Sequence, residues 1–353
     1  MRTISFQNFH EFTPQNNFEV KVYDFCEKWR SNSQSFTFFT SGSTGEPKKI
    51  ILAREQLENS AKQTISWLKL KENQVALLCI SPEFIGGAMV LVRAMMAQMD
   101  LLLIEPQQDV TAELISCRQS IHLASFVPNQ WKVLLNSKID LNSIFKNAVG
   151  VLIGGADLDL VTKNKTHNCC QFPVYLTYGM TETVSHIAFQ SIGIHPTNFL
   201  ETLPFVKIRQ TLDGKLCIAS PSTWQKWIET EDLVEIIESN KFLIKGRANR
   251  IINSAGLKIN PKALEEKLDV FFELHELQVN FFIAGVADDF FGEVVSIFVE
   301  GSQTFELNKL NDFLIQFFEK NKLPKRLYQL VTFEKTPSGK IDQQKTIGKA
   351  LAI

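Results

Sequence analysis

The sequence predicts an α/β protein, and three observations support this prediction. Short apolar runs alternate with helical patterns between residues 75 and 176, two hairpin signals follow, and the pattern changes again after residue 246. Strands that alternate with helices favour a doubly wound, mostly parallel sheet with right-handed crossovers. We therefore expect a large N-terminal domain over residues 1–247, with this sheet and a small antiparallel β unit, and a small α+β C-terminal domain over residues 248–353.

The N-terminal elements follow from the spacing of apolar residues. A lead-in with one amphipathic helix over Val20–Trp29 comes first, then a strand at Phe36–Phe39 that runs into a Ser/Thr/Gly loop, and a helix over Arg54–Leu68. The alternating region predicts strands at Val75–Ile80, Leu101–Ile104, His122–Val127, Val149–Ile153 and Val174–Leu176. Helices are expected between them at Gly86–Met99, Thr111–Gln119, Asn129–Leu135 and Leu158–Lys165.

Two turn signals, Asp213-Gly214 and Ser239-Asn240, separate the next apolar runs. They predict the antiparallel unit as two hairpins, Val206–Gln210 with Lys215–Ala219 and Leu233–Ile237 with Phe242–Lys245. The C-terminal part then predicts a short strand pair, a helix at Pro261–Phe272, strands at Val279–Val286 and Val294–Val299, a helix at Leu307–Lys320 and a strand at Leu330–Phe333.

The composition excludes several classes of function. Apolar residues make up 44% of the chain, charged residues 21%, and the net charge is −1, which is ordinary for a globular protein and gives no reason to expect nucleic acid or an anionic membrane as partner. The N-terminus lacks a signal-peptide pattern, and no apolar run approaches membrane-spanning length. The six cysteines show no Cys-x-x-Cys and no disulfide-framework spacing. We expect a cytoplasmic protein with reduced thiols, and the sequence leaves a homo-oligomer open.

The loop after Phe39 has the chemistry of a polyphosphate grip. Its glycines let backbone N–H groups crowd an anion, its hydroxyls add donors, and its lysine adds charge. It is not a Walker A loop, because its glycines are three residues apart and no Gly-Lys-Ser/Thr follows. A plain surface turn is the alternative. The candidate residues are Thr40, Ser41, Gly42, Ser43, Thr44, Gly45 and Lys48.

A second candidate segment, Tyr178–Thr183, follows the strand at Val174–Leu176. A tyrosine at a strand end can stack on a planar base, Thr181 can hydrogen-bond a phosphate, and Glu182 can hold Mg²⁺ together with phosphate oxygens. An ordinary βα turn is the alternative. Because ligands of such sheets lie beyond the carboxyl ends of the strands, we expect this segment and the Ser/Thr/Gly loop at the same edge.

Two further candidates carry charge. Asp232 can take the two hydroxyls of a ribose and Arg247 can support it, although a surface ion pair is the alternative. Lys340 lies in a Pro-Ser-Gly-Lys turn, where a lysine by itself is a solvated charge.

These segments, in this order, resemble the motifs of the adenylate-forming superfamily of acyl-CoA synthetases, adenylation domains and luciferases. Ile251–Pro261 also resembles the segment that opens the C-terminal domain of that family, so that the resemblance covers nearly the whole chain from Phe36 on. It implies that a small-molecule carboxylic acid is activated by ATP with Mg²⁺ and then transferred to CoA. It also implies that the C-terminal domain is mobile and turns about a hinge near Asn249.

The resemblance implies a role for each candidate. Catalysis falls to Lys340, Thr181 and Glu182, and Glu182 is the metal ligand. ATP is bound by the Ser/Thr/Gly loop together with Gly154, Gly155, Tyr178, Gly179, Asp232 and Arg247. CoA is bound by Ser254, Ala255 and Gly256.

Within the superfamily the chain is most similar to the o-succinylbenzoate–CoA ligases of menaquinone biosynthesis, through Tyr178–His186 and the helix segment Gly86–Arg93. Arg93 is the one charge in an apolar helix, and a buried arginine needs an anionic partner. The resemblance implies that this partner is the second carboxylate of a diacid, whereas a side chain that snorkels to water is the alternative. The implied substrate-binding residues are Arg93, Gly87, Thr183 and Ser185. A CoA ligase for another aryl or fatty acid, or an adenylation module that loads a carrier protein, stays open.

The chain departs from the family pattern at several positions. Lys49 follows the loop lysine where the family has glycine, Glu231 stands in its Thr-Gly-Asp motif, Asn249 occupies the hinge, and Ala255 replaces one of two paired glycines. The histidine usual before the substrate helix is absent near Ile85, and much of the usual N-terminal region is missing. Asn249 keeps a small polar residue at the hinge.

Overall fold

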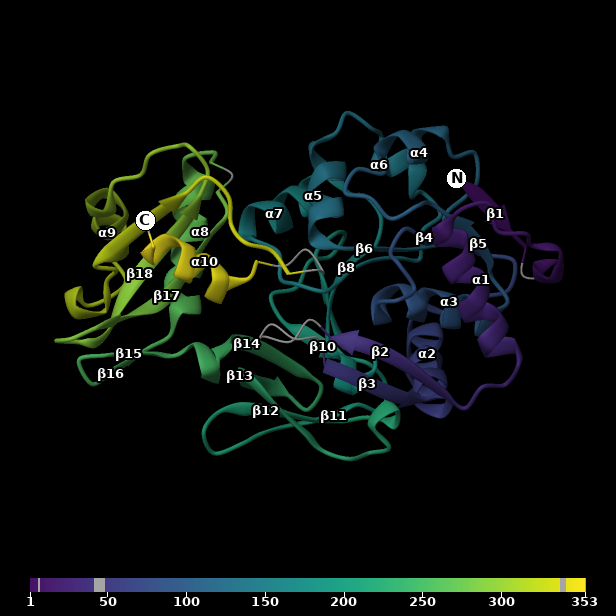
Figure 1. The fold of residues 1–353 in the computed structure, drawn as a ribbon, viewed down its shortest axis with the longest axis horizontal. Helices are drawn as coiled ribbons and strands as arrows, with labels where there is room; N and C mark the ends of the chain where they lie inside the picture. Colours follow the sequence, from purple (N-terminus) through teal and green to yellow (C-terminus); the bar gives the residue numbers. More distant parts are fainter. Residues whose placement is uncertain (6, 41–47, 278, 337–340, 353) are drawn as a thin grey trace.

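A twelve-stranded mixed sheet dominates the computed structural model, which describes residues 1–5, 7–40, 48–277, 279–336 and 341–352 (Figure 1). Along the sheet the strands follow the order β1-β5-β4-β6-β7-β8-β9-β10-β14-β13-β12-β11. Their bounds are β1 (Arg2–Ile4), β4 (Val75–Leu78), β5 (Asp100–Leu103), β6 (Leu123–Phe126), β7 (Gly150–Ile153), β8 (Val174–Gly179), β9 (His186–Ser191), β10 (Leu200–Thr202), β11 (Lys207–Gln210), β12 (Lys215–Ala219), β13 (Ile228–Glu238) and β14 (Lys241–Arg247).

The alternating region forms the doubly wound part, as the sequence predicts. Strands β5, β4, β6, β7 and β8 run parallel to one another. Successive side chains of β4 enter different cores, because Ala76 and Leu78 pack on one face and Leu77 and Cys79 on the other. On the first face lie α1 (Asn17–Arg30), α2 (Arg54–Leu68) and α3 (Ile85–Ala97), and on the second lie α4 (Thr111–Ser116), α5 (Pro128–Asn136), α6 (Leu141–Ile144) and α7 (Leu160–Cys169).

Three expectations about the sheet are wrong. The hairpins β11–β12 and β13–β14 are not a separate unit, because β9 and β10 connect them to β8 through antiparallel pairs, and the sheet is mixed rather than mostly parallel. The strand before the Ser/Thr/Gly loop, β2 (Ser35–Thr40), does not belong to this sheet. It pairs antiparallel with β3 (Lys48–Ala53) in a two-stranded sheet of its own, and residues 41–47 between them lie outside the described residues.

The C-terminal elements surround a five-stranded sheet, on the left in Figure 1. Its strands are β15 (Ile252–Ser254), β16 (Leu257–Ile259), β17 (Phe281–Asp288), β18 (Gly292–Glu300) and β19 (Arg326–Leu330), and its helices are α8 (Pro261–Leu274), α9 (Leu307–Leu314) and α10 (Gln343–Leu351). Two hydrophobic clusters belong to this part alone. The α+β pattern is confirmed, α9 is shorter than expected, and the boundary at residues 247 and 248 stays a prediction.

Short 3₁₀ segments complete the chain, namely η1 (Phe9–Glu11), η2 (Thr181–Thr183), η3 (Pro221–Thr223), η4 (Ala248–Arg250) and η5 (Lys320–Lys322).

All six cysteines are free thiols, and Cys26, Cys79, Cys170 and Cys217 are buried, as their apolar surroundings predict. Within the described ranges, every helix is too short or too polar to cross a membrane.

Candidate active site

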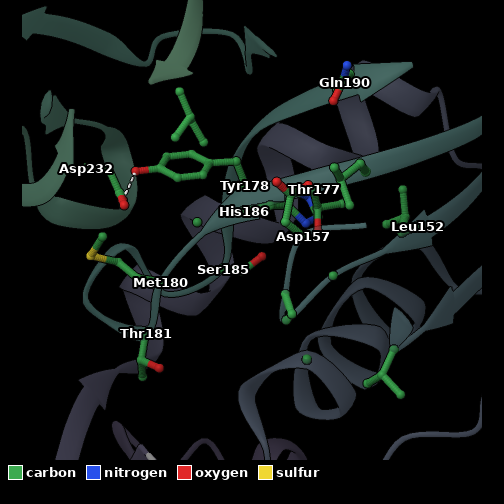
Figure 2. Close-up of a pocket in the computed structure, with 18 of the residues that line it drawn as sticks. Leu152, Asp157, Thr177, Tyr178, Met180, Thr181, Ser185, His186, Gln190 and Asp232 are labelled. Carbon is green, nitrogen blue, oxygen red and sulfur yellow. Dashed lines mark hydrogen bonds between the residues drawn. The ribbon is translucent and has the colours of Figure 1, made fainter. Parts of the chain in front are cut away.

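A cleft of about 1720 Å³ opens where the large sheet meets the C-terminal part. Its walls come from the ends of β7 and β8, from α3, from the hairpin β13–β14 and from the first turns of α8. Figure 2 shows Tyr178, Met180 and Thr181 on one continuous turn of this wall, with Asp232 across from Tyr178. The predicted residues that line the cleft are Arg93, Gly154, Gly155, Tyr178, Gly179, Thr181, Glu182, Ser185, Asp232 and Arg247.

The predicted phosphate loop and catalytic lysine are beyond what the structure describes. Ser41, Gly42, Ser43, Thr44, Gly45 and Lys340 lie outside the described residues. Their flanks reach the cleft, because Phe38 and Phe39 at the end of β2 line it, and so does Lys335. The backbones of Thr40 and Lys48 pair at the end of the β2–β3 hairpin, and Lys335 forms a β-bridge with Ile341.

Tyr178, Asp232 and Arg247 form one group, joined by a hydrogen bond and an ion pair. The Tyr178 hydroxyl donates to Asp232 Oδ2 over 2.6 Å, and Arg247 Nε lies 3.2 Å from Asp232 Oδ1. The register of β13 and β14 sets Asp232 opposite Arg247, and the Tyr178 ring packs edge-on against Phe242. Burial, and then the Asp232 carboxylate, raises the pKa of the Tyr178 phenol, so that the phenol keeps its proton as a donor. The aspartate is only 9% exposed, whereas the Arg247 side chain is about half exposed, so the ion pair is buried on the aspartate side and open to solvent on the arginine side.

The turn between β8 and β9 depends on close backbone packing. A Cβ at Gly179 would lie 2.2 Å from the Ser185 carbonyl oxygen, so that a side chain cannot fit there. Thr183 is fully buried, its hydroxyl accepts from the Met180 N–H over 3.0 Å, and its one proton faces two carbonyl oxygens, those of Met180 and Ser185, each at 2.9 Å. Val184 adopts φ 71° and ψ −55°, a strained conformation for a β-branched residue. Thr183 lies behind the cleft wall, and its role in substrate binding stays a prediction.

Glu182 projects from this turn as an exposed side chain of the cleft. Within the described residues it forms no hydrogen bond and no ion pair, and no group of three His, Cys, Asp or Glu side chains is arranged to hold a metal ion. A single free carboxylate suits Mg²⁺, which commonly takes one or two carboxylates and completes its shell with phosphate oxygens and water.

The glycine pair after β7 leaves the cleft floor bare. A Cβ at Gly154 would lie 2.4 Å from Thr177 Oγ1, and Gly155 has φ 98°, a conformation that L side chains rarely adopt. The Thr177 hydroxyl donates to the Ile153 carbonyl over 3.1 Å, which fixes it between β7 and β8. A flat group can therefore approach the backbone at this position.

Arg93, a residue of α3, lines one end of the cleft. It is 2% exposed, which contradicts the alternative that it snorkels to water. Its Nη2 donates to Ser185 Oγ over 2.7 Å, Nε has no partner, and no ion pair joins it to an acid within the described ranges. Burial lowers the pKa of the guanidinium to about 9, which leaves it charged at neutral pH. Gly87 lies behind it, where α3 packs so closely on Ser81 that a Cβ would lie 2.3 Å from the Ser81 carbonyl oxygen.

The structure adds cleft residues that the sequence did not single out. His186, at the start of β9, lies 2.8 Å from Thr64 Oγ1 and 3.5 Å from Arg93 Nη2. Asp157 pairs with Lys163 at 2.9 Å and, across the cleft, with Lys262 of α8 at 3.3 Å. His186 ends the segment Tyr178–His186 that carries the resemblance, but no role was assigned to it from the sequence, and nothing local indicated the Asp157–Lys262 pair.

The predicted CoA residues are not part of this cleft lining. Ser254, Ala255 and Gly256 form the turn between β15 and β16, where the Ala255 N–H donates to the Phe291 carbonyl over 2.8 Å. Asn249 lies in η4, between the last strand of the large sheet and the first strand of the C-terminal sheet. Its role as a hinge stays a prediction.

Comparisons with known proteins show the family of the chain. Residues 4–207 match the family model of the AMP-binding enzymes. The chain is 25% identical to 2-succinylbenzoate–CoA ligase of Listeria monocytogenes, with 93% of this chain and 72% of that protein covered. It is 24% identical to the ligase of the same name from Staphylococcus epidermidis, with 96% and 74% covered.

Two solved structures are similar to the fold. An acyl-CoA synthetase (AMP-forming)/AMP-acid ligase II-like protein from Dyadobacter fermentans has 30% identity, 99% coverage of both chains and a TM-score of 0.66. The o-succinylbenzoate coenzyme A synthetase of Bacillus subtilis, solved with ATP and magnesium ion, has 21% identity, 88% and 69% coverage and a TM-score of 0.76. At this identity the second structure supports the fold alone.

Proposed function

The chain belongs to the AMP-binding enzyme family and is an AMP-forming acid–CoA ligase, and from this premise we propose that its acid substrate is o-succinylbenzoate (2-succinylbenzoate). The proposed reaction converts the acid, ATP and CoA into o-succinylbenzoyl-CoA, AMP and pyrophosphate, as a step of menaquinone biosynthesis. The observation that carries the choice of substrate is Arg93, a buried cation in the cleft with an unpartnered Nε and no acidic partner within the described residues. The names of the Listeria and Staphylococcus relatives support it.

A diacid can pair with Arg93 through one carboxylate while its other carboxylate reacts. One carboxylate pairs with the guanidinium, whose charge otherwise stays uncompensated in the protein interior. The other carboxylate is then free to react at the opposite side of the cleft. Ser185 accepts from Arg93 and borders the same position. A monoacid would leave the guanidinium without a counter-ion, which favours o-succinylbenzoate over benzoate or a fatty acid.

In the first step an oxygen of the reacting carboxylate attacks the α-phosphorus of ATP. The bond from that phosphorus to the bridging oxygen breaks, and pyrophosphate leaves. Catalysis of such a step is mostly positioning and stabilisation of charge. We assign the loop Thr40–Lys48 to the β- and γ-phosphates and Thr181 to the reacting phosphate. Mg²⁺, held by Glu182 and phosphate oxygens, supplies charge neutralisation when bound, and the free Glu182 carboxylate fits this assignment.

The nucleoside binds on the other side of the turn. Asp232, held by Tyr178 and Arg247, is assigned to the two ribose hydroxyls, because its oxygens accept and it is fixed on two sides. The bare backbone at Gly154 and Gly155, together with Tyr178 and Gly179, is assigned to the adenine.

In the second step the CoA thiolate attacks the acyl carbon, the bond to the AMP oxygen breaks, and AMP leaves. We assign Lys340 to the first step and Ser254, Ala255 and Gly256 to the path of CoA in the second. Lys335, close to Lys340 in sequence, lines the cleft, whereas the turn at Ser254–Gly256 does not. A rotation of the C-terminal part about Asn249 would exchange the two.

A panel of acids tests the proposal. We expect CoA-dependent release of AMP with o-succinylbenzoate and at least about tenfold lower kcat/KM with benzoate and with fatty acids, since a lost charge-assisted contact is worth about 1.5–3 kcal/mol. Robust turnover of a monoacid with none of o-succinylbenzoate would refute the substrate. Turnover without saturable dependence on free CoA would instead indicate an adenylation module that loads a carrier protein.

A further inference from the structure

A buried polar cluster closes the α3 end of the cleft, and its members come from separate elements. Thr64 of α2 is 0% exposed, Arg93 of α3 is 2% exposed and His186 of β9 is 9% exposed. His186 Nε2 lies 2.8 Å from Thr64 Oγ1 and 3.5 Å from Arg93 Nη2. Figure 2 shows Ser185 and His186 to one side of the turn that carries Met180 and Thr181. The cluster therefore touches both the cleft and the core.

Donor and acceptor chemistry fixes the state of the imidazole. Arginine has donors only, so the nitrogen that faces it must offer a lone pair. Because Arg93 can only donate, we assign Nε2 of His186 as the acceptor and place the ring proton on Nδ1. The Thr64 hydroxyl then donates to the same Nε2, which is closer than its other acceptor, the Ser60 carbonyl oxygen at 3.3 Å. Burial, and then the charge of Arg93, hold the pKa of His186 well below its usual range, which keeps the ring neutral.

The same contacts fix the guanidinium. Ser185 Oγ and His186 Nε2 both contact the same nitrogen of the Arg93 guanidinium, Nη2. Nε remains without a partner, although a buried unsatisfied donor is costly. Arg93 and His186 both line the cleft. An arginine that lines the cleft and keeps one donor, Nε, without a partner is arranged for an anion that enters from the cleft.

We propose that His186, supported by Thr64, is a positioning residue that holds the Arg93 guanidinium in the orientation in which it binds the second carboxylate of the acid, and that it thereby sets selectivity for diacids over monoacids. The inference rests on the proposed function, because it needs an acid with a second carboxylate. Neutrality of the ring is part of the role, since an imidazolium would repel the guanidinium and compete for the carboxylate.

Steady-state kinetics with two acids test this role. The probes are o-succinylbenzoate and 4-oxo-4-phenylbutanoate, which lacks the aryl carboxylate but keeps a carboxylate to activate. His186→Phe keeps a ring in contact with Phe189 and removes the acceptor, and Thr64→Val keeps the shape and removes the hydroxyl. We expect KM for o-succinylbenzoate to rise about 10- to 100-fold in His186→Phe, with kcat, KM for ATP and KM for the monoacid within about twofold of wild type.

Thr64→Val is expected to shift the same parameter in the same direction by a smaller factor, and Thr64→Ser to restore it. An equal loss with both acids, or an unchanged KM for o-succinylbenzoate in both variants, overturns the positioning role. If His186→Phe does not unfold cooperatively on heating, the comparison of Thr64→Val with Thr64→Ser decides. Wild-type enzyme that turns over other acids but not o-succinylbenzoate refutes the proposed function and, with it, this role of His186.

Discussion

The Asp232 carboxylate contacts two side chains from different strands. Tyr178 of β8 donates to one oxygen and Arg247 of β14 faces the other, so that the side chain is fixed before any ligand arrives. The pair Tyr178–Asp232 also connects the parallel part of the sheet with the hairpin β13–β14. A preorganised acceptor of this kind suits two neighbouring hydroxyls, because both ribose oxygens can donate to it.

Asp232→Asn tests this group at the residue scale. The amide removes the charge that holds Arg247 and offers one acceptor instead of two, so we expect KM for ATP to rise about tenfold or more and kcat to change less. Initial rates at varied ATP measure both. Glu235→Gln, at an exposed position of the same strand, is the control and should leave both parameters unchanged. An unaltered KM for ATP in Asp232→Asn would assign the ribose to other residues.

The junction of β8 and β9 shows how an element positions several site residues together. A register shift separates Tyr178 from Gly179, and Gly179 lies against the Ser185 backbone. Thr183 and the strained Val184 then turn the chain, so that Thr181 and Glu182 face the cleft and Ser185 reaches Arg93. The turn stores strain at a site, which the surrounding packing over-determines.

Gly179→Ala should destabilise the protein by about 1–3 kcal/mol and lower activity, because the new Cβ meets backbone atoms that cannot give way. Gly348→Ala is the matched control. Gly348 lies in α10, and a Cβ added there would have no neighbour within 4 Å, so alanine should stabilise by about 0.4–1 kcal/mol. Urea unfolding measures both, and equal effects of the two substitutions would contradict the packing argument.

Helix α8 carries a carboxyl group with an altered proton affinity. Burial, and then Asp159 and Glu265, raise the pKa of Asp269 to about 7. The folded protein therefore keeps a proton that the unfolded chain releases near about 3.9, so the stability from this group is fully present below that value and is lost as pH rises through about 7.

Asp269→Asn should raise the free energy of unfolding at pH 8 by on the order of 1–2 kcal/mol and flatten its fall between pH 4 and pH 8. Urea denaturation at several pH values measures this. Glu266→Gln, an exposed position of the same helix, should leave the profile within about 0.5 kcal/mol of wild type. A steeper fall with pH in Asp269→Asn would mean that the group is ionised in the folded state.

At the scale of the molecule, the part of the chain around the large sheet and the C-terminal part contact each other through polar side chains. Lys262 of α8 reaches Asp157 over 3.3 Å, and Asn164 of α7 donates to Glu273 of α8 over 2.5 Å. The apolar clusters of the two parts are separate. An interface of this composition favours relative motion, because separating it exposes little apolar surface. This supports the proposed rotation about Asn249.

Lys340→Ala tests that rotation. We expect it to lower adenylate formation by at least about a hundredfold, since it removes a charge from the reacting oxygens, while thioester formation from pre-made acyl-adenylate stays near wild type. Pyrophosphate exchange and CoA-dependent AMP release measure the two half-reactions. Lys345→Ala, on the exposed side of α10, should spare both. Equal loss of both half-reactions in Lys340→Ala would refute the exchange of segments.

The sequence by itself determined the alternating strands and helices and the hairpins, and it named Tyr178, Asp232 and Arg247 as candidate site residues. These follow from local spacing and from residue types, which short-range sterics and hydrogen bonding fix. It left open whether Arg93 is buried with an anionic partner or snorkels to water, and the structure decided for burial.

Only the tertiary structure decided how these pieces join. The hairpins belong to the same sheet as the parallel strands, and β2 and β3 form a sheet of their own. Thr64, Arg93 and His186 come from three elements, and His186 contacts the other two. Strand pairing between distant segments and side-chain contacts across a core depend on the packing of the whole chain, which no window of sequence contains. The same reason explains why Asp157 and Lys262, more than a hundred residues apart, escaped prediction.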